Sequence, residues 1–324
     1  MRPANARPPT AADPAANWHR QPERGSRGLL GAAAYLSLRL GRRCGRVILY
    51  GIAVYFFLFA SAARVCMRDY LRRALGREPL ARDRFRLVMN FASTVQDRLY
   101  LLAGRYEQFE ISVQGESLVR EILDSRSGAF LFGAHVGSFE VLRSIGQRQP
   151  GLEVAMAMYE DNARKINAIL AAAAPQNPPE IIPLGRVEAM LKIRERLDEG
   201  AFVGMLADRT FGDEPSLAVS FLGATARLPL GPMRAAALMR RQVIFMLGPY
   251  RGHNHYHIIF EPLADFSKTP ASQLKAAVEA AVTRYAIMLE QFCRTDPYNW
   301  FNFFDFWRGA ENLPAPAANR PIER

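Results

Sequence analysis

The sequence predicts an α/β domain whose central, mainly parallel mixed sheet is flanked by helices and preceded by an N-terminal hydrophobic membrane-anchoring helix. Two observations lead to this prediction. Short apolar runs alternate with amphipathic segments over most of the chain, which is typical of strands joined by crossover helices. Before them stands one long uncharged segment that arginines bound on both sides.

The 324-residue chain divides into four predicted parts. Residues 1–17 are rich in Ala, Pro and Asn and predict a disordered tail, and residues 311–324 predict a second tail. Residues 18–83 form a basic segment that contains the anchor helix, and residues 84–310 form the main domain. Three widely spaced cysteines without a CxxC pair argue against a disulfide scaffold and against a cysteine-built zinc site.

The predicted anchor helix is the uncharged run 47–63, which Arg46 and Arg64 bound. As a helix it would span about 25 Å, against about 30 Å of hydrocarbon, and snorkelling arginines could close this gap. Arg64, Arg68 and Arg72 repeat at a spacing that lines one helix face, which anionic lipid headgroups attract. A buried core helix is the alternative interpretation, and the basic flanks on both sides leave the orientation open.

The main domain begins with a helix at 84–102, where apolar residues recur at helical spacing. Uncharged apolar runs then predict buried strands, and amphipathic stretches between them predict helices. The predicted strands are 128–134, 152–158, 201–207, 243–247 and 256–261. The predicted helices that follow the first are 141–146, 162–174, 187–199, 232–241 and 273–293.

The most informative stretch is HVGSFE at 135–140, directly after the first strand. His135 falls at the carboxyl end of that strand, where open α/β sheets bind their ligands. Gly137 permits a tight turn and Ser138 suits a helix N-cap, so the turn can bring Glu140 towards His135. A carboxylate that orients a histidine makes it a general base. The alternative is a core histidine with an ordinary first-turn carboxylate.

The HVGSFE box resembles the H-x4-D/E box of the lysophospholipid acyltransferase superfamily, and within it the lipid A lauroyl and myristoyl acyltransferases. Ala-Asp-Arg at 207–209 and VSFLGATARLPLGP at 219–232 resemble further elements of that branch, in the same order. The start NWHRQPERGS and the end DPYNWFNFFDFW resemble a narrower group, the acyltransferases of aryl polyene and flexirubin-type pigment clusters. The resemblance covers residues 17–307.

The resemblance implies a membrane-associated enzyme that moves an acyl group from acyl carrier protein to a hydroxyl of a lipid or glycolipid. It implies His135 as the base, Glu140 as its partner, and the bacterial inner membrane as the location, with the catalytic domain on the cytoplasmic face. Lipid A acylation is the alternative to aryl polyene biosynthesis, and a P-E-G-T box for glycerol phosphate is missing. The implied substrate-binding positions are Asp208, Arg209, Gly223 and Asn162. Arg143 follows Glu140 by three residues and so could face the same site, although a surface ion pair is slightly favoured for it.

The charge balance favours acidic partners. The net charge is +11, and the basic residues are 38 Arg and 4 Lys. Acyl carrier proteins and anionic membrane lipids carry the complementary charge. A nucleic-acid partner is not expected, because the chain has no helix-turn-helix, zinc or RNP signature. A non-catalytic membrane-binding scaffold remains the alternative of another class.

Cofactors and metals are not expected. The sequence contains neither GxxxxGK[ST] nor GxGxxG, so a nucleotide cofactor has no phosphate loop to bind. His253, His255 and His257 alternate and would share one face of a strand, where a solvated face is favoured over a metal site. The aromatic segment 298–307 predicts either a lipid-facing patch or core packing of the C-terminal region.

Overall fold

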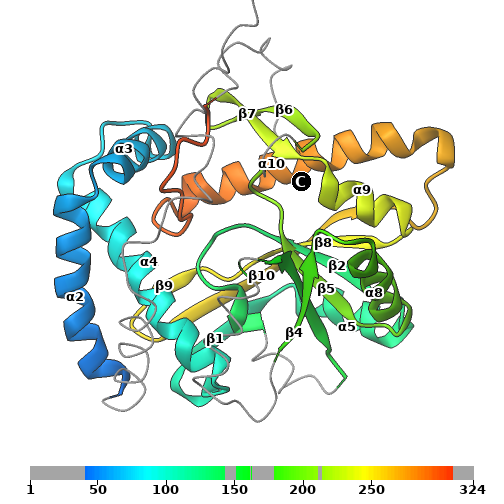
Figure 1. The fold of residues 1–324 in the computed structure, drawn as a ribbon, viewed down its shortest axis with the longest axis horizontal. Helices are drawn as coiled ribbons and strands as arrows, with labels where there is room; N and C mark the ends of the chain where they lie inside the picture. Colours follow the sequence, from blue (N-terminus) through cyan, green and yellow to red (C-terminus); the bar gives the residue numbers. More distant parts are fainter. Residues whose placement is uncertain (1–40, 143–150, 161, 163–178, 211–213, 309–324) are drawn as a thin grey trace, which may run out of the picture.

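A computed structural model describes residues 41–142, 151–160, 162, 179–210 and 214–308 (Figure 1). Both predicted tails lie outside these residues, as do residues 18–40 of the basic segment and, except for Asn162, the predicted helix 162–174.

The central sheet has eight strands in the order β1-β10-β8-β2-β5-β3-β4, with β9 paired to β10. Strands β8, β2, β5, β3 and β4 are parallel, whereas β10 is antiparallel to β8. The prediction of a mixed, mainly parallel sheet is therefore confirmed. The strands are β1 (Glu110–Gln114), β2 (Ala129–Gly133), β3 (Val154–Tyr159), β4 (Glu180–Leu184), β5 (Phe202–Leu206), β8 (Gln242–Leu247), β9 (Tyr250–Gly252) and β10 (His255–Asp265).

Strands β2 and β5 lie in the middle of the sheet, which explains their apolar sequences. In their parallel register Gly133 lies beside Leu206, the last residue of each strand. His135 and Asp208 each follow two residues later, so the register brings both to the same edge of the sheet.

A separate antiparallel hairpin was not predicted as strands. It consists of β6 (Ser216–Phe221) and β7 (Ala224–Pro229), joined by Leu222 and Gly223. Both turn residues have positive φ, at 50° and 78°, as a two-residue hairpin turn demands. Glu290 of the neighbouring helix accepts the backbone N–H of Leu222 at 2.8 Å, which stabilises this conformation.

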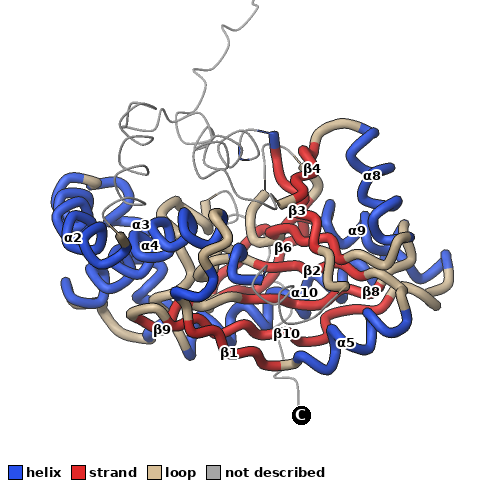
Figure 2. Tube along the Cα trace, turned by 90° about the horizontal axis from the view of Figure 1, so that it is seen from below, coloured by secondary structure: helices blue, strands red, loops and turns tan. Residues whose placement is uncertain are grey.

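Helices cover the sheet and gather at one side of it. In Figures 1 and 2, α2, α3 and α4 stand together beside β9, and the long α10 crosses the sheet. The helices are α2 (Arg42–Phe59), α3 (Ser61–Leu75), α4 (Ala81–Leu102), α5 (Glu116–Ser125), α8 (Val187–Asp198), α9 (Gly231–Leu238) and α10 (Leu274–Thr295).

The predicted anchor run 47–63 is not one helix. Helix α2 ends at Phe59, Ala60 has non-helical angles (φ −87°, ψ 73°), and α3 begins at Ser61. The break turns α3 so that Tyr70 is buried, with its ring centroid 4.9 Å from that of Trp300. Among the described helices, none alone is long and apolar enough to cross a membrane; Arg42–Phe59 and Ala63–Leu75 meet that test together but are bent by 92°.

Helix α2 has an exposed apolar face. Its inner face buries Gly45 and Ala53, and the helix packs on α4. The large apolar side chains that remain exposed on α2 are Val47, Ile48, Tyr50, Ile52, Val54, Tyr55, Leu58 and Phe59.

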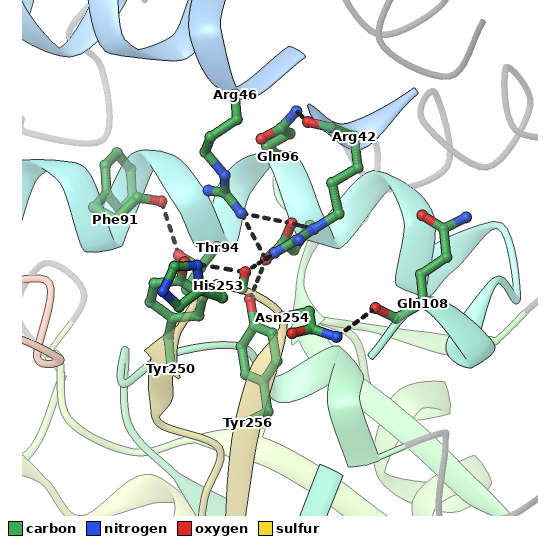
Figure 3. A network of polar contacts seen from close by, with 11 residues as sticks. Arg42, Arg46, Phe91, Thr94, Gln96, Gln108, Tyr250, His253, Asn254 and Tyr256 are labelled. Atoms are coloured by element: carbon green, nitrogen blue, oxygen red, sulfur yellow. Dashed lines mark hydrogen bonds and ion pairs between the residues drawn. The ribbon is translucent and has the colours of Figure 1, made fainter. Parts of the chain in front are cut away.

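A buried carboxylate fastens α2 to the domain (Figure 3). The Asp97 side chain of α4 is fully buried, and its oxygens lie 2.6 Å from Arg42 Nε and 3.1 Å from Arg46 Nη2. The hydroxyl of Tyr256 on β10 donates to the same carboxylate at 3.0 Å. One charge therefore joins α2, α4 and the sheet.

We expect Asp97→Ala to lower the free energy of unfolding by about 3–5 kcal/mol, because it leaves two partly buried guanidinium groups without their anion. Asp69→Ala is the matched control, since that carboxylate also pairs with two arginines but is 32% exposed. The control should cost about 0–1 kcal/mol. Denaturant unfolding in detergent measures both, and equal losses would contradict the assignment.

Candidate active site

The centre of the candidate site is a hydrogen bond between a histidine and a buried aspartate at the carboxyl edge of the sheet. The Nδ1 atom of His135 lies 2.8 Å from Asp208 Oδ1. The backbone N–H of His135 donates to Asp208 Oδ2 at 3.0 Å. The imidazole keeps 29% of its surface exposed, whereas the aspartate side chain has none.

Asp208 is a buried carboxylate with three donors. Besides the two groups of His135, the indole Nε1 of Trp300 donates to Oδ2 at 2.9 Å. Burial by itself raises the pKa of the Asp208 carboxyl, but His135 and Arg209 outweigh this effect and hold the pKa well below its usual value. Asp208 is therefore ionised at neutral pH and acts as an acceptor.

His135 is neutral at the same pH. Burial and the positive charge of Arg209 lower the pKa of His135, and Asp208 offsets part of this shift. Because the ionised carboxylate accepts a hydrogen bond from Nδ1, the proton lies on Nδ1 and the lone pair lies on Nε2. A partly exposed, oriented and unprotonated imidazole nitrogen is the arrangement of a general base.

The turn after His135 requires glycine at two positions. Gly137 has φ +55°, and a Cβ there would lie 2.0 Å from the carbonyl oxygen of Gly248. On β5, a Cβ at Gly204 would lie 2.2 Å from the ring of Phe139, so the missing side chain makes room for that ring. These close contacts fix the turn against the sheet.

The C-terminal aromatic segment closes the site from the other side. The N–H of Gly137 donates to the carbonyl of Asn299 at 3.1 Å, and the N–H of Phe301 donates to the carbonyl of His135 at 2.8 Å. Trp300, Phe301, Phe306 and Trp307 are all buried, so these aromatic residues pack in the core. The indole of Trp300 is a site residue that sequence reasoning missed, because no spacing links it to Asp208.

Glu140 lies in the short 3-10 turn η3 (Phe139–Leu142) and does not hold the imidazole. Its Oε2 accepts from Ser138 Oγ at 2.8 Å, and its Oε1 lies 2.5 Å from Arg98 Nε. Sequence reasoning placed Glu140 on His135, whereas the carboxylate on Nδ1 is Asp208. Ser138 uses its hydroxyl for Glu140 rather than for an N-cap, and the predicted helix 141–146 leaves the described residues after Leu142.

The other predicted substrate residues are more scattered. Arg209 is half-buried, donates to the carbonyl of Phe301 at 2.9 Å and stacks over Phe304. Gly223 is exposed in the turn between β6 and β7, so it belongs to the hairpin and not to the strand ends that carry His135 and Asp208. Asn162 is exposed just after β3, and Arg143 lies outside the described residues. Their roles in substrate binding stay predictions.

Two backbone amides in the turn after His135 are already used. The N–H of Gly137 donates to Asn299, and the N–H of Ser138 donates to the carbonyl of Gly248 at 3.0 Å. Neither amide is therefore available to a substrate in this arrangement.

The alternating histidines pair with strand β1. His255 Nε2 lies 2.6 Å from Glu110, and His257 Nδ1 lies 2.7 Å from Ser112 Oγ, each opposite its register partner. His253 is not in the strand: it lies in the turn before β10 with φ 49°. In the part of the chain that the structure describes, no group of three or more His, Cys, Asp or Glu side chains could hold a metal ion.

A cavity of about 1060 Å³ lies at the N-terminal end of α2 and does not include His135. Figure 3 shows the arginine side of this region, where Arg42 and Arg46 reach Asp97 beside His253 and Asn254. Arg43, Val47 and Tyr50 also line the cavity, so basic and apolar side chains meet there.

Comparison with known proteins gives one family. The model of the bacterial lipid A biosynthesis acyltransferase family matches residues 22–309 of this chain. A search of curated proteins finds no match. The matched range contains β2, β5 and the side chains of His135, Asp208 and Trp300.

We expect the pKa of His135 to lie below 6.5, the ordinary value for histidine. Asp208→Asn should lower it further, because the substitution removes the negative charge that favours the imidazolium. Proton–carbon NMR of the histidine rings over a pH series measures both, and loss of one signal in His135→Gln assigns the resonance. A pKa of His135 above 6.5, or a rise in Asp208→Asn, would contradict the description of this pair.

Proposed function

The chain belongs to the bacterial lipid A biosynthesis acyltransferase family, and from that membership we propose that it transfers an acyl group from an acyl carrier protein thioester to a hydroxyl of a lipid acceptor. Family membership makes the chain an acyltransferase of lipid biosynthesis. The donor, the acceptor and the roles of individual residues are the proposal.

The observation that carries this proposal is the His135–Asp208 pair. A histidine whose Nδ1 is held by a buried carboxylate, and whose other nitrogen is unprotonated, can remove a proton from a hydroxyl. Acyl transfer to an alcohol needs this step, because a neutral hydroxyl attacks a thioester slowly. The same pair argues against the alternative of a non-catalytic membrane scaffold, which would have no use for a poised base.

The proposed reaction runs through one tetrahedral intermediate. His135 Nε2 takes the proton of the acceptor hydroxyl while that oxygen forms a bond to the thioester carbonyl carbon. The carbonyl electron pair moves onto oxygen, and Asp208 stabilises the imidazolium that forms. When the carbonyl re-forms, the carbon–sulfur bond breaks, and the leaving thiolate takes the proton from His135. The products are an ester and a free thiol.

Charge supports an acidic carrier as the donor. The chain has a net charge of +11, and acyl carrier proteins are strongly acidic, so long-range attraction would speed their encounter. A soluble cytoplasmic donor would place the catalytic domain on the cytoplasmic face of the bacterial inner membrane.

Helix α2 supports association with the membrane. Its outer face exposes eight large apolar residues, and the cavity at its N-terminal end is lined with arginines. An apolar helix face beside basic side chains is suited to the boundary between anionic headgroups and acyl chains. We propose that α2 enters this boundary and that anionic lipids are its partners.

Two acceptors are proposed within the same chemistry. The resemblance of both ends of the chain to the pigment-cluster acyltransferases favours an aryl polyene or a related lipid. The family description favours the lipid A precursor as the alternative. Both acceptors offer a hydroxyl to the same base, so the mechanism does not distinguish them.

The decisive test follows thiol release from acyl carrier protein thioesters in the presence of total bacterial lipid. We expect His135→Ala to lower turnover by about 10²–10⁴-fold, because the general base is lost. Glu140→Ala should lower turnover less severely. His255→Ala, a histidine on the exposed strand face, is the matched control and should keep wild-type turnover. Normal turnover in His135→Ala would refute the mechanism, and mass spectrometry of the lipid identifies the acceptor.

Membrane association has a separate test. We expect the protein to sediment with vesicles that contain phosphatidylglycerol and to bind neutral phosphatidylcholine vesicles more weakly. Replacing Val47, Tyr55 and Phe59 by serine should weaken binding about tenfold or more, because each loses apolar surface that the bilayer would bury. Val187→Ser with Leu238→Ser removes comparably exposed apolar residues elsewhere. Equal effects of the two sets would contradict a specific role for α2.

A further inference from the structure

Glu140 is bound from two sides by groups other than the imidazole, whose Nδ1 is bonded to Asp208 instead. Ser138 Oγ donates to Oε2 at 2.8 Å, and Arg98 Nε lies 2.5 Å from Oε1. The carboxylate side chain is 5% exposed, so it needs the positive charge of Arg98 as its counter-ion. The acidic residue of the HVGSFE box therefore fixes an arginine from α4, which lies far away in the sequence.

Arg98 keeps donors for another group. Its side chain is 37% exposed, and its contact with Glu140 runs through Nε, so the two terminal nitrogens are not needed for that ion pair. Through its contact with Glu140, which follows His135 by five residues, the guanidinium is held at the turn that carries the imidazole, and its positive charge contributes to the lowered pKa of His135. A partly exposed, fixed guanidinium beside a general base is suited to bind an anionic oxygen.

The other donors around His135 are committed elsewhere. The amides of Gly137 and Ser138 donate to backbone carbonyls. Arg209 is half-buried and donates to the carbonyl of Phe301. Arg98 thus combines exposure, charge and terminal donors beside the imidazole.

We propose that Arg98 binds the oxygen of the acyl carbonyl as negative charge develops on it, and that Glu140 positions Arg98 rather than His135. This inference rests on the proposed acyl transfer. Arg98 is then a catalytic residue, and Glu140 and Ser138 are positioning residues that act through it. The charge on the oxyanion is greatest in the tetrahedral intermediate, so the contact lowers the barrier more than it strengthens substrate binding.

The kinetic test compares Arg98→Gln and Arg98→Lys with Arg82→Gln, which removes an exposed arginine from the same helix. Loss of one oxyanion donor typically lowers kcat by about 10²–10³-fold. We expect a fall of this size in Arg98→Gln with KM for the acyl carrier thioester within about threefold, and a smaller fall in Arg98→Lys. Arg82→Gln should match the wild type. A raised KM with unchanged kcat would instead mean ground-state binding of an anionic group, and would overturn the oxyanion assignment.

A double substitution tests what Glu140 positions. If Glu140 acts through Arg98, Glu140→Gln should lower kcat in the wild-type background but add little in the Arg98→Gln background. If Glu140 acts on His135, the two losses should multiply. Multiplying losses would therefore overturn the positioning role, even with His135 confirmed as the base.

The pH dependence separates a catalytic effect from a merely structural one. The charged groups around His135 are Asp208, Arg209, Arg98 and Glu140, and the ionisable hydroxyl of Tyr285 donates to the nearby carbonyl of Gly133. Removal of the positive charge of Arg98 should raise the pKa of His135, so the acidic limb of kcat/KM should move to higher pH in Arg98→Gln and stay in place in Arg98→Lys.

NMR of the His135 ring gives the same pKa without turnover. An unchanged pKa in a folded Arg98→Gln variant would overturn the placement of Arg98, whatever the reaction proves to be. If Arg98→Gln does not fold, Arg98→Lys decides, because a wild-type kcat in that variant would exclude the need for a guanidinium donor. Failure of the proposed function is distinguishable, since it would leave the wild type itself without thiol release.

Discussion

The buried charge of Asp208 is the constraint on which the site depends. An ionised carboxylate without solvent needs hydrogen-bond donors, and this one receives two from His135 and one from Trp300. Those three bonds join the end of β5, the turn after β2 and a segment about 90 residues later in the chain. The hydrogen bonds that stabilise the Asp208 carboxylate therefore also orient the imidazole of His135.

A similar arrangement recurs at the edge of the domain. Asp97 is fully buried and gathers two arginines from α2 and a tyrosine hydroxyl from β10. Glu140 is nearly buried and gathers Ser138 and Arg98. In each case one buried carboxylate fixes the position of the arginine or histidine side chains that contact it. The excess of arginine in this sequence is thus partly structural.

The sequence predicts the strands that carry the site and the residues that end them. Runs 128–134 and 201–207 match β2 and β5, and the rule on carboxyl strand ends favours His135, whereas Asp208 is predicted only from the family resemblance and as a substrate-binding position. The partner of His135 was harder to predict, because Glu140 is near in sequence whereas strand order decides what is near in space. Trp300 and Arg98 leave no local signal, since their places depend on long-range packing. The break at Ala60 has the same origin: composition marks 47–63 as apolar, and burial of α3 decides where the helix bends.

The pairing of residues 299–301 with the turn at His135 has a consequence for biosynthesis. A ribosome makes β2 and β5 long before it makes Trp300, so the nascent chain carries His135 and Asp208 while their third partner is still untranslated. The His135–Asp208 pair can therefore gain its third hydrogen-bond partner only after the aromatic segment has left the exit tunnel. The complete site is therefore a property that the chain acquires late in its own synthesis.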